Sequence, residues 1–174
     1  VHGVSTERAE AEGVDPPDAI EEIVALLSSA LANGIPIVAF NARFDLTILD
    51  REARRYGIEP LSQLEVVDPF VIDKHLDRFR KGKRTLEAVC AHYRAELDGA
   101  HTADADALAA ARVAWRMGQA PELAGMLLDE LHKAQVGWAA EQAQSLQEYF
   151  RRQGKAEHVE PVWPVVPMPG AMVA

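Results

Sequence analysis

The sequence contains little cysteine and no long apolar run, and each shortage excludes a class of protein. Its single cysteine, Cys90, rules out an internal disulfide and a cysteine-based zinc cluster. No apolar stretch approaches the roughly 20 residues that cross a bilayer, and the acidic N-terminal segment lacks the layout of a signal peptide. We therefore expect a cytoplasmic protein with no membrane partner.

What remains is the composition of an ordinary globular protein. The chain has 174 residues, 48% of them hydrophobic and 26% charged, which is enough for one domain with its own core. A net charge of −9 argues against a polyanion as partner, but six basic residues and one acid fall within residues 74–84. This basic island is either a solvated surface segment or a surface that contacts a phosphate backbone.

Hydrophobic periodicity predicts several helices and two buried strands. Helices are expected over residues 19–32, 42–56, 85–93 and 103–117, and strands over 35–40 and 64–67. The order strand, helix, strand in the middle of the chain indicates an α/β fold. Beyond Pro121, an apolar stripe from Leu127 to Phe150 predicts a long helix or a broken helical pair that ends at Gly154. The proline-rich end is expected to pack as an irregular strap or to dangle.

Two aspartates fall where helical periodicity predicts the core. At 100° per residue, Asp45 lies opposite the arginines of helix 42–56, and Asp106 lies with Val113, away from Arg112. A buried carboxylate needs a partner or a cation, because leaving it unpaired costs several kcal/mol. The alternative to a cation site is that Asp45 lies in the first turn of its helix, where its negative charge interacts favourably with the helix dipole.

His101 precedes the second of these helices in a loop after Gly99. An imidazole titrates near neutral pH, which is what a general base requires. Two inward acids with a histidine beside them predict a site for a hard cation. Magnesium fits this set better than zinc, because the six histidines show no close ligand pairing.

Several segments, taken in order, resemble the motifs of the DEDDh 3′-to-5′ exonucleases. The second and third motifs of that family resemble N-A-R-F-D at residues 41–45 and H-T-A-D-A-D at 101–106. Between these two motifs, V-D-P at 67–69 looks like the family's strand-end aspartate, and T-L-E-A-V-C at 85–90 looks like the helix that follows it. Before them, V-H-G-V-S at 1–5 looks like the family's histidine-glycine segment. The family includes the proofreading epsilon subunit of DNA polymerase III and RNase T. The resemblance implies a ribonuclease H-like α/β fold.

The resemblance also implies a role for each matching residue. The implied roles are metal ligand for Asp45 and Asp106, general base for His101, terminal-nucleotide contact for Asn41 and Phe44, and supporting acid for Asp68. Lys83 and Arg84 of the basic island are candidates for binding the substrate backbone. The implied reaction is two-metal hydrolysis with Mg²⁺ or Mn²⁺ at the 3′ end of single-stranded DNA, of the proofreading or repair type, with a DNA polymerase as a candidate partner.

Two other functions stay open from the sequence. One is RNA end trimming as in RNase T, since nothing in these residues decides the sugar preference. The other is a non-catalytic module that binds nucleic acid or a polymerase through the basic island and the helical C-terminus, with Phe79 available for stacking.

The family's first motif has no counterpart, because no D-x-E followed by Thr occurs in the chain. Two of the four metal-binding carboxylates and three strands of the sheet would be missing with it. The sequence is then either a fragment of a complete exonuclease, which its start at Val1 supports, or a degenerate relative. Retention of both aspartates and the histidine favours the fragment, and we expect the chain alone to be inactive.

The resemblance suggests three parts. Residues 1–117 would be the C-terminal portion of an N-terminally truncated exonuclease domain, and residues 118–154 a helical extension. Residues 155–174 would be a proline-rich tail. The extension and tail look like the C-terminal extension of actinobacterial members of the family.

Overall fold

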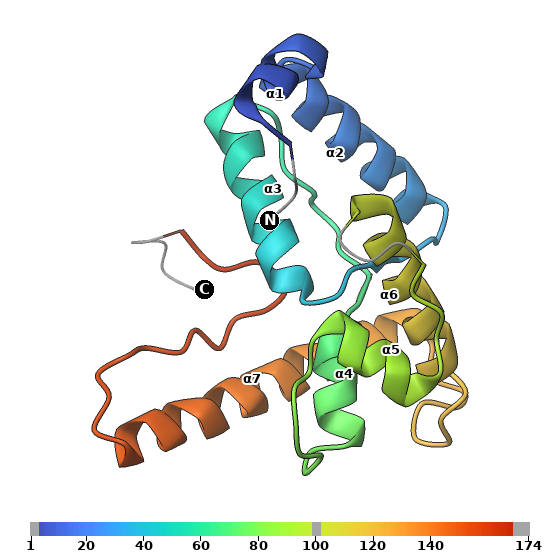
Figure 1. The fold of residues 1–174 in the computed structure, drawn as a ribbon, viewed down its shortest axis with the longest axis vertical. Helices are drawn as coiled ribbons and strands as arrows, with labels where there is room; N and C mark the ends of the chain where they lie inside the picture. The colour runs from blue at the N-terminus through green and yellow to red at the C-terminus, as the bar shows by residue number, and fades with distance from the viewer. Residues whose placement is uncertain (1–3, 99–101, 169–174) are drawn as a thin grey trace.

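The computed structural model describes residues 4–98 and 102–168, which are mostly helical (Figure 1) and include one small sheet. The elements in chain order are α1 (Thr6–Glu12), α2 (Pro16–Ala32), β1 (Ile37–Val38), α3 (Ala42–Arg55), β2 (Val66–Val67), α4 (Pro69–Leu76), α5 (Leu86–Tyr93), α6 (Ala103–Met117) and α7 (Leu128–Arg152). Among the described helices, none has the length and apolar character needed to cross a bilayer.

The sheet consists, in the described part of the chain, of β1 and β2 in parallel. Ile37 pairs with Val66, and Val38 pairs with Val67. Parallel neighbours need a crossover connection, which α3 supplies here. The carboxyl ends of both strands therefore lie at the same edge, where the start of α3 meets the residue after β2. The predicted strand, helix, strand unit is confirmed.

Most predicted helices lie where periodicity placed them, and α6 spans the expected residues 103–117. Two short helices, α1 and α4, were not predicted. The start of α4 nevertheless has a sequence signal: Asp68 is its N-cap and accepts a hydrogen bond from the Phe70 amide, and Pro69 occupies its first position. At eight residues, α4 is too short for periodicity alone to reveal.

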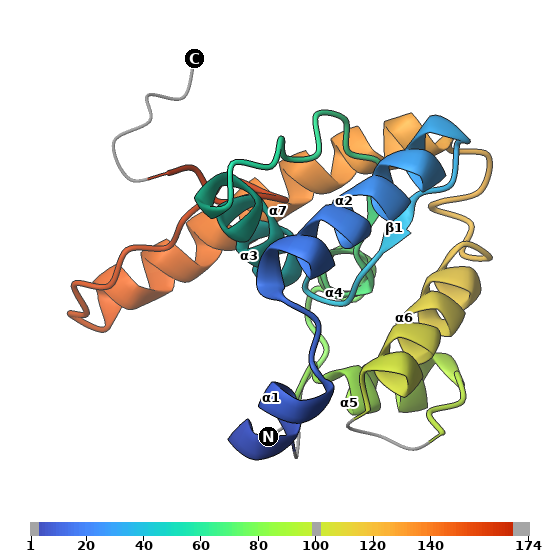
Figure 2. The same ribbon diagram turned by 90° about the horizontal axis from the view of Figure 1, so that it is seen from above.

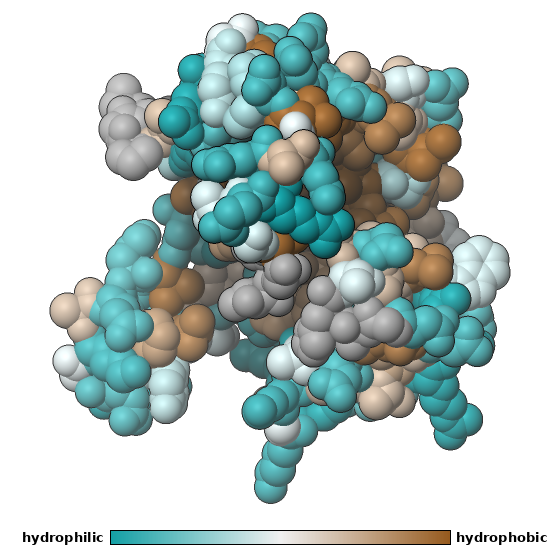
Figure 3. Space-filling view, turned by 45° about the horizontal axis from the view of Figure 1, so that its top comes forward, coloured by the Kyte–Doolittle hydropathy of each residue, from teal (hydrophilic) through white to brown (hydrophobic). Residues whose placement is uncertain are grey.

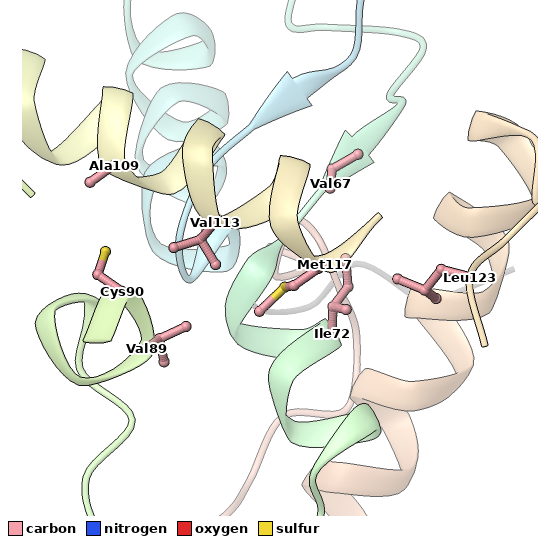
Figure 4. Packing of buried hydrophobic residues seen from close by; sticks show 8 residues of the cluster. All are labelled: Val67, Ile72, Val89, Cys90, Ala109, Val113, Met117 and Leu123. Atoms are coloured by element: carbon pink, nitrogen blue, oxygen red, sulfur yellow. The ribbon is translucent and has the colours of Figure 1, made fainter. Parts of the chain in front are cut away.

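The core has two clusters of buried side chains, and the chain beyond residue 117 contributes to both. The first joins α4, α5 and α6 to β2 and includes Val89, Val113 and Met117, as Figure 4 shows. The second lies around the start of α3 and includes Leu46 together with Ala139 of α7 and Trp163. Because α7 and the chain after it supply core residues, they are integral to the packing of this molecule.

The described C-terminal segment, residues 155–168, packs as an irregular strap. It runs back from the end of α7 to α3 (Figure 2). Arg51 Nη2 donates to the carbonyl oxygens of Val166 and Pro167 at 2.8 Å each, and the Val166 amide donates to Thr47 Oγ1 at 3.0 Å. Of the two expected behaviours, the strap is confirmed for these residues, which we call the C-terminal strap.

Helix α7 is one uninterrupted helix with a buried stripe that differs from the expected one. Its buried residues are Gln135, Ala139 and Ala143, whereas Leu127 and Leu146 of the predicted stripe are exposed. Two alanines let the helix backbone approach its neighbours closely, and Gln135 bonds to the backbone around β2. Close approach and hydrogen bonding therefore decide the inward face here, and side-chain hydrophobicity alone does not.

Candidate active site

The carboxyl edge of the sheet gathers Asn41, Phe44, Asp45 and Asp68. β1 leads into α3 through Asn41, whose backbone is left-handed at φ 65°. Asparagine adopts this conformation more readily than most residues with a side chain. The turn brings the first residues of α3 against Asp68, which directly follows β2. The parallel strands thus place these four residues at one edge of the sheet.

Asp68 is the centre of a buried hydrogen-bond network. Its carboxylate accepts from the amides of Asn41 (2.9 Å), Ala42 (3.0 Å) and Phe70 (2.9 Å), and from Trp163 Nε1 (3.3 Å). These donors come from the starts of two helices and from the C-terminal strap. Its oxygens are therefore committed to contacts within the protein, and the carboxylate fixes how α3 and α4 leave the sheet.

The burial of Asp68 raises the pKa of its carboxyl group. The side chain is 1% exposed, and its four hydrogen bonds oppose the rise in pKa that this burial causes. The Asp68 amide also has a buried partner, because it donates to Gln135 Oε1 at 2.7 Å. Backbone and side chain of Asp68 are therefore both anchored.

Asp45 lies on an exposed face of α3, so the prediction that it faces the core is wrong. The buried side chains of this helix are those of Ala42, Leu46 and Ala53. The prediction failed because it took the arginines to mark the solvent side. Arg43 and Arg51 instead donate to main-chain carbonyls of the C-terminal strap, which covers that side of the helix.

The surroundings of Asp45 leave its carboxylate accessible. It sits in the first turn of α3 beside Phe44, which is 65% exposed. Partial burial raises the pKa of the Asp45 carboxyl, and a backbone hydrogen bond opposes the change. Among the described residues, no cationic side chain forms an ion pair with Asp45. An exposed acid beside an exposed ring is a surface feature, not a packed one.

Asp106 lies on the inward side of α6, as predicted. It is half-buried, and Ala110, Val113 and Met117 of the same helix are buried. Burial raises the pKa of the Cys90 thiol, and the negative charge of Asp106 adds to that rise. Asp106 therefore lies close enough to α5 to act on Cys90 electrostatically.

The general base expected from the sequence, His101, lies outside the described residues, as does the segment His2-Gly3. Within the described ranges, no group of three or more His, Cys, Asp and Glu side chains is placed to hold a metal ion. Asp45 and Asp106 offer carboxylate oxygens of the kind that Mg²⁺ prefers. Asp45 lies on α3 and Asp106 on α6, and within the described residues the structure shows no metal-binding group that contains them both.

Part of the basic island is neutralised inside the protein. Asp73 is fully buried and forms ion pairs with both Arg80 and Arg84, the latter at 2.6 Å. Arg84 also donates to the main chain of residue 77, which holds its guanidinium in place. By contrast, Lys81 and Lys83 are exposed between α4 and α5. Arg84 is thus a structural cation in this arrangement, whereas the lysines remain open to solvent.

Sequence reasoning missed the residues of α7 and the C-terminal strap that support this edge. Gln135 Nε2 donates to the Val66 carbonyl at 2.8 Å, and His132 Nδ1 accepts from the Val66 amide at 3.2 Å. Trp163 packs in the core and bonds to Asp68. The sequence contained two signals for these residues. One is a pair of polar residues spaced three apart on an apolar helix face, and the other is a bulky ring in a proline-rich tail.

The sequence of this chain matches the model of one protein family. The family model described as Exonuclease matches residues 4–114. The match includes the segments 41–45 and 101–106, and it ends before α7 and the C-terminal strap. No curated protein and no solved structure shows a significant match to the chain.

Proposed function

This chain belongs to the exonuclease family, and from that membership we propose that it forms part of a 3′-to-5′ exonuclease acting on DNA ends. The observation that carries the proposal is the pairing of N-A-R-F-D at residues 41–45 with H-T-A-D-A-D at 101–106, both inside the family match. The reaction would release a nucleoside 5′-monophosphate from a single-stranded 3′ end, as in proofreading or repair.

We assign the roles in this reaction from the motifs that these residues share with the family. Asp45 and Asp106 would hold divalent cations, and His101 would take the proton of the attacking water. Asp45 suits its role because its carboxylate is accessible and without an ion-pair partner among the described residues. Asn41 and Phe44 are exposed beside it, where a terminal nucleotide would be bound. Mg²⁺ or Mn²⁺ ions, once bound, would activate the water and stabilise the leaving 3′ oxygen.

Asp68 would position this site without touching the metal ions. Its four hydrogen bonds hold the turn at Asn41 and the first residues of α3, from which Asp45 projects. A carboxylate that is 1% exposed and bonded to four donors has no oxygen directed to solvent. The rigidity of this turn would keep the Asp45 carboxylate in place as substrate binds.

The site would be completed by a D-x-E strand that this sequence lacks. Apolar side chains gather at the upper right of the face in Figure 3, over α2. On α2, Ile23 and Leu26 are exposed, and on α6 so are Leu108 and Trp115. Both helices contact β1, the strand next to which a further strand would pair. We propose that the D-x-E strand lies against β1 and covers these apolar stripes.

The test is hydrolysis by a protein that carries this chain together with a D-x-E segment. Asp106→Ala should abolish release of nucleoside monophosphate from a 3′-labelled single strand in Mg²⁺ or Mn²⁺. Asp104→Asn is the matched control, because Asp104 lies in the same helical turn but is exposed. Activity that survives Asp106→Ala, or is lost only in Asp104→Asn, would overturn the assignment.

The sugar preference is decided in the same assay. DNA and RNA strands of one sequence are offered together, and each product is measured. Faster cleavage of DNA supports the proofreading type. Faster cleavage of RNA would instead support end trimming as in RNase T, with the same residues in the same roles.

A further inference from the structure

A groove runs between α4 and α7, outside the carboxyl edge of the sheet. Its cavity has a volume of about 410 Å³ and is lined by Lys74, His75, Arg78, Arg84, Trp138, Glu141, Gln142 and Ser145. This volume is in the range of ligand-binding pockets. One wall, α4, lies inside the family match, and the other, α7, lies beyond it. The groove is therefore not a feature of the exonuclease domain alone.

The groove is rich in positive charge that the protein itself does not neutralise. Lys74 is half-buried, and Arg78 is exposed at the end of α4. Within the described part of the chain, neither forms an ion pair with a carboxylate. Arg84 is tied to buried Asp73, and Glu141 is the acidic residue of the lining. Lys74 and Arg78 are thus available to an anion from solution.

Lys74 has an electrostatic reason to bind an anion. Burial lowers the pKa of its ammonium, and the charges of Arg84 and Arg43 lower it further, while the charges of Asp68 and Asp73 oppose the change in part. Its contact with the ring of Phe70, at 4.8 Å from the centroid, compensates only in part for lost water. An approaching phosphate would relieve the mutual repulsion of these cations.

The groove shares lining residues with a second cavity at the edge of the sheet. This second cavity, of about 210 Å³, shares Lys74 and Gln142 with the first and reaches Asn41 and Asp68 at the sheet edge. Lys74 therefore lies at the junction of the two cavities. A chain-like ligand that ends near Asn41 would pass Lys74 before it reaches Arg78. Such a path suits a polymer with regularly spaced charges.

The groove also has a flat aromatic wall. The rings of His75 and Trp138 stack at 3.8 Å between centroids, with 12° between their planes. His75 is exposed, so the stacked pair is accessible from solvent on the His75 side. Aromatic faces beside a cationic groove are the usual platform for bases of single strands, worth about 1–3 kcal/mol per base.

We infer that the groove between α4 and α7 binds the phosphates of a single nucleic-acid strand whose 3′ end lies at the carboxyl edge of the sheet. Lys74 and Arg78 would contact phosphates, and His75 with Trp138 would support a base. This inference rests on the proposed function for the direction of the strand. The binding itself needs no hydrolysis and no metal ion.

The experiment measures binding of the 174-residue chain to a fluorescent 16-nucleotide oligothymidylate in EDTA, by anisotropy across a salt titration. Lys74→Gln with Arg78→Gln should make the negative slope of log K against log salt shallower by about 1.4, because each single-strand phosphate contact contributes about −0.7. At about 0.1 M salt this corresponds to roughly 25-fold weaker binding. Arg78→Gln alone, at an exposed position, should weaken binding about 5-fold and keeps the test valid if Lys74 variants unfold.

The matched control is Arg151→Gln with Arg152→Gln, which removes the same charge from the exposed end of α7. The control should bind like the unaltered chain. If the groove variants bind the oligothymidylate as tightly as the control does, the inference is overturned. It is also overturned if polyglutamate of equal charge displaces the labelled strand as effectively as unlabelled oligothymidylate does. The second result would assign the groove to an acidic protein partner. Either result is independent of hydrolysis, which tests the proposed function separately.

Discussion

The indole Nε1 of Trp163 donates a hydrogen bond of 3.3 Å to Oδ2 of Asp68, although the two residues are 95 positions apart. This contact joins the C-terminal strap to the carboxylate that holds the start of α3. Trp163 is 4% exposed and packs in the same cluster as Leu46. The strap thus reaches the support of the candidate site, even though it lies outside the family match.

Trp163→Phe should destabilise the chain moderately. The ring would still fill most of the space, but the Asp68 carboxylate would lose one of its four donors, which costs about 2 kcal/mol for a charged acceptor. Trp163→Ala should cost about 4 kcal/mol, because it also leaves a cavity. Urea unfolding measures both. Trp115→Phe is the control at a ring that is 74% exposed, where a change within about 0.5 kcal/mol is expected. A phenylalanine variant as stable as the unaltered chain would show that the hydrogen bond contributes nothing.

Stability should fall as pH is lowered below about 6.5, because of His132. Burial lowers the pKa of its imidazole, and its Nδ1 must stay unprotonated to accept from the Val66 amide. Since the folded state resists a proton that the unfolded state accepts, the stabilisation is complete above the unfolded pKa. It is lost as pH falls through the folded pKa, by at most about 1.4 kcal/mol per pH unit.

His132→Gln isolates this effect, because an amide oxygen accepts a hydrogen bond and does not titrate. Urea unfolding between pH 5 and 8 should show a shallower loss of stability on the acid side for the variant than for the unaltered chain. His158→Gln, at an exposed position, serves as the control and should leave the profile unchanged. Identical profiles for the unaltered chain and the glutamine variant at 132 would assign the acid sensitivity to other groups.

The sequence allowed both strands and the longer helices to be predicted in their correct order, because these elements depend on local pattern. Helix 103–117 was bounded correctly by periodicity, and Asp106 was placed on its inward face. Asp45 was placed wrongly for a physical reason. Arginine usually marks the solvent side of a helix, but Arg43 and Arg51 donate hydrogen bonds to the C-terminal strap, more than 110 residues away in the sequence. No local window contains that contact.

The support of the site could not be predicted for the same reason. Gln135 and His132 act on the backbone of Val66, and these pairs are separated by 69 and 66 positions. In sequence, both look like polar interruptions of an apolar stripe. Their function depends on which face of α7 meets β2, which the close packing of its alanines determines.

The apolar stripes of α2 and α6 give the sharpest test of the missing D-x-E strand. Leu26 is 68% exposed and Trp115 is 74% exposed in this chain. Leu26→Glu and Trp115→Glu should therefore change its free energy of unfolding by less than about 0.5 kcal/mol each. They should also reduce self-association in sedimentation, because exposed apolar patches associate. In a protein that also carries the D-x-E strand, the same positions would be covered, so a buried charge should cost several kcal/mol. If both substitutions are equally harmless in the longer protein, the proposed strand does not lie on these helices. Glu10→Gln on α1, exposed and away from both stripes, is the control that should be neutral in either context.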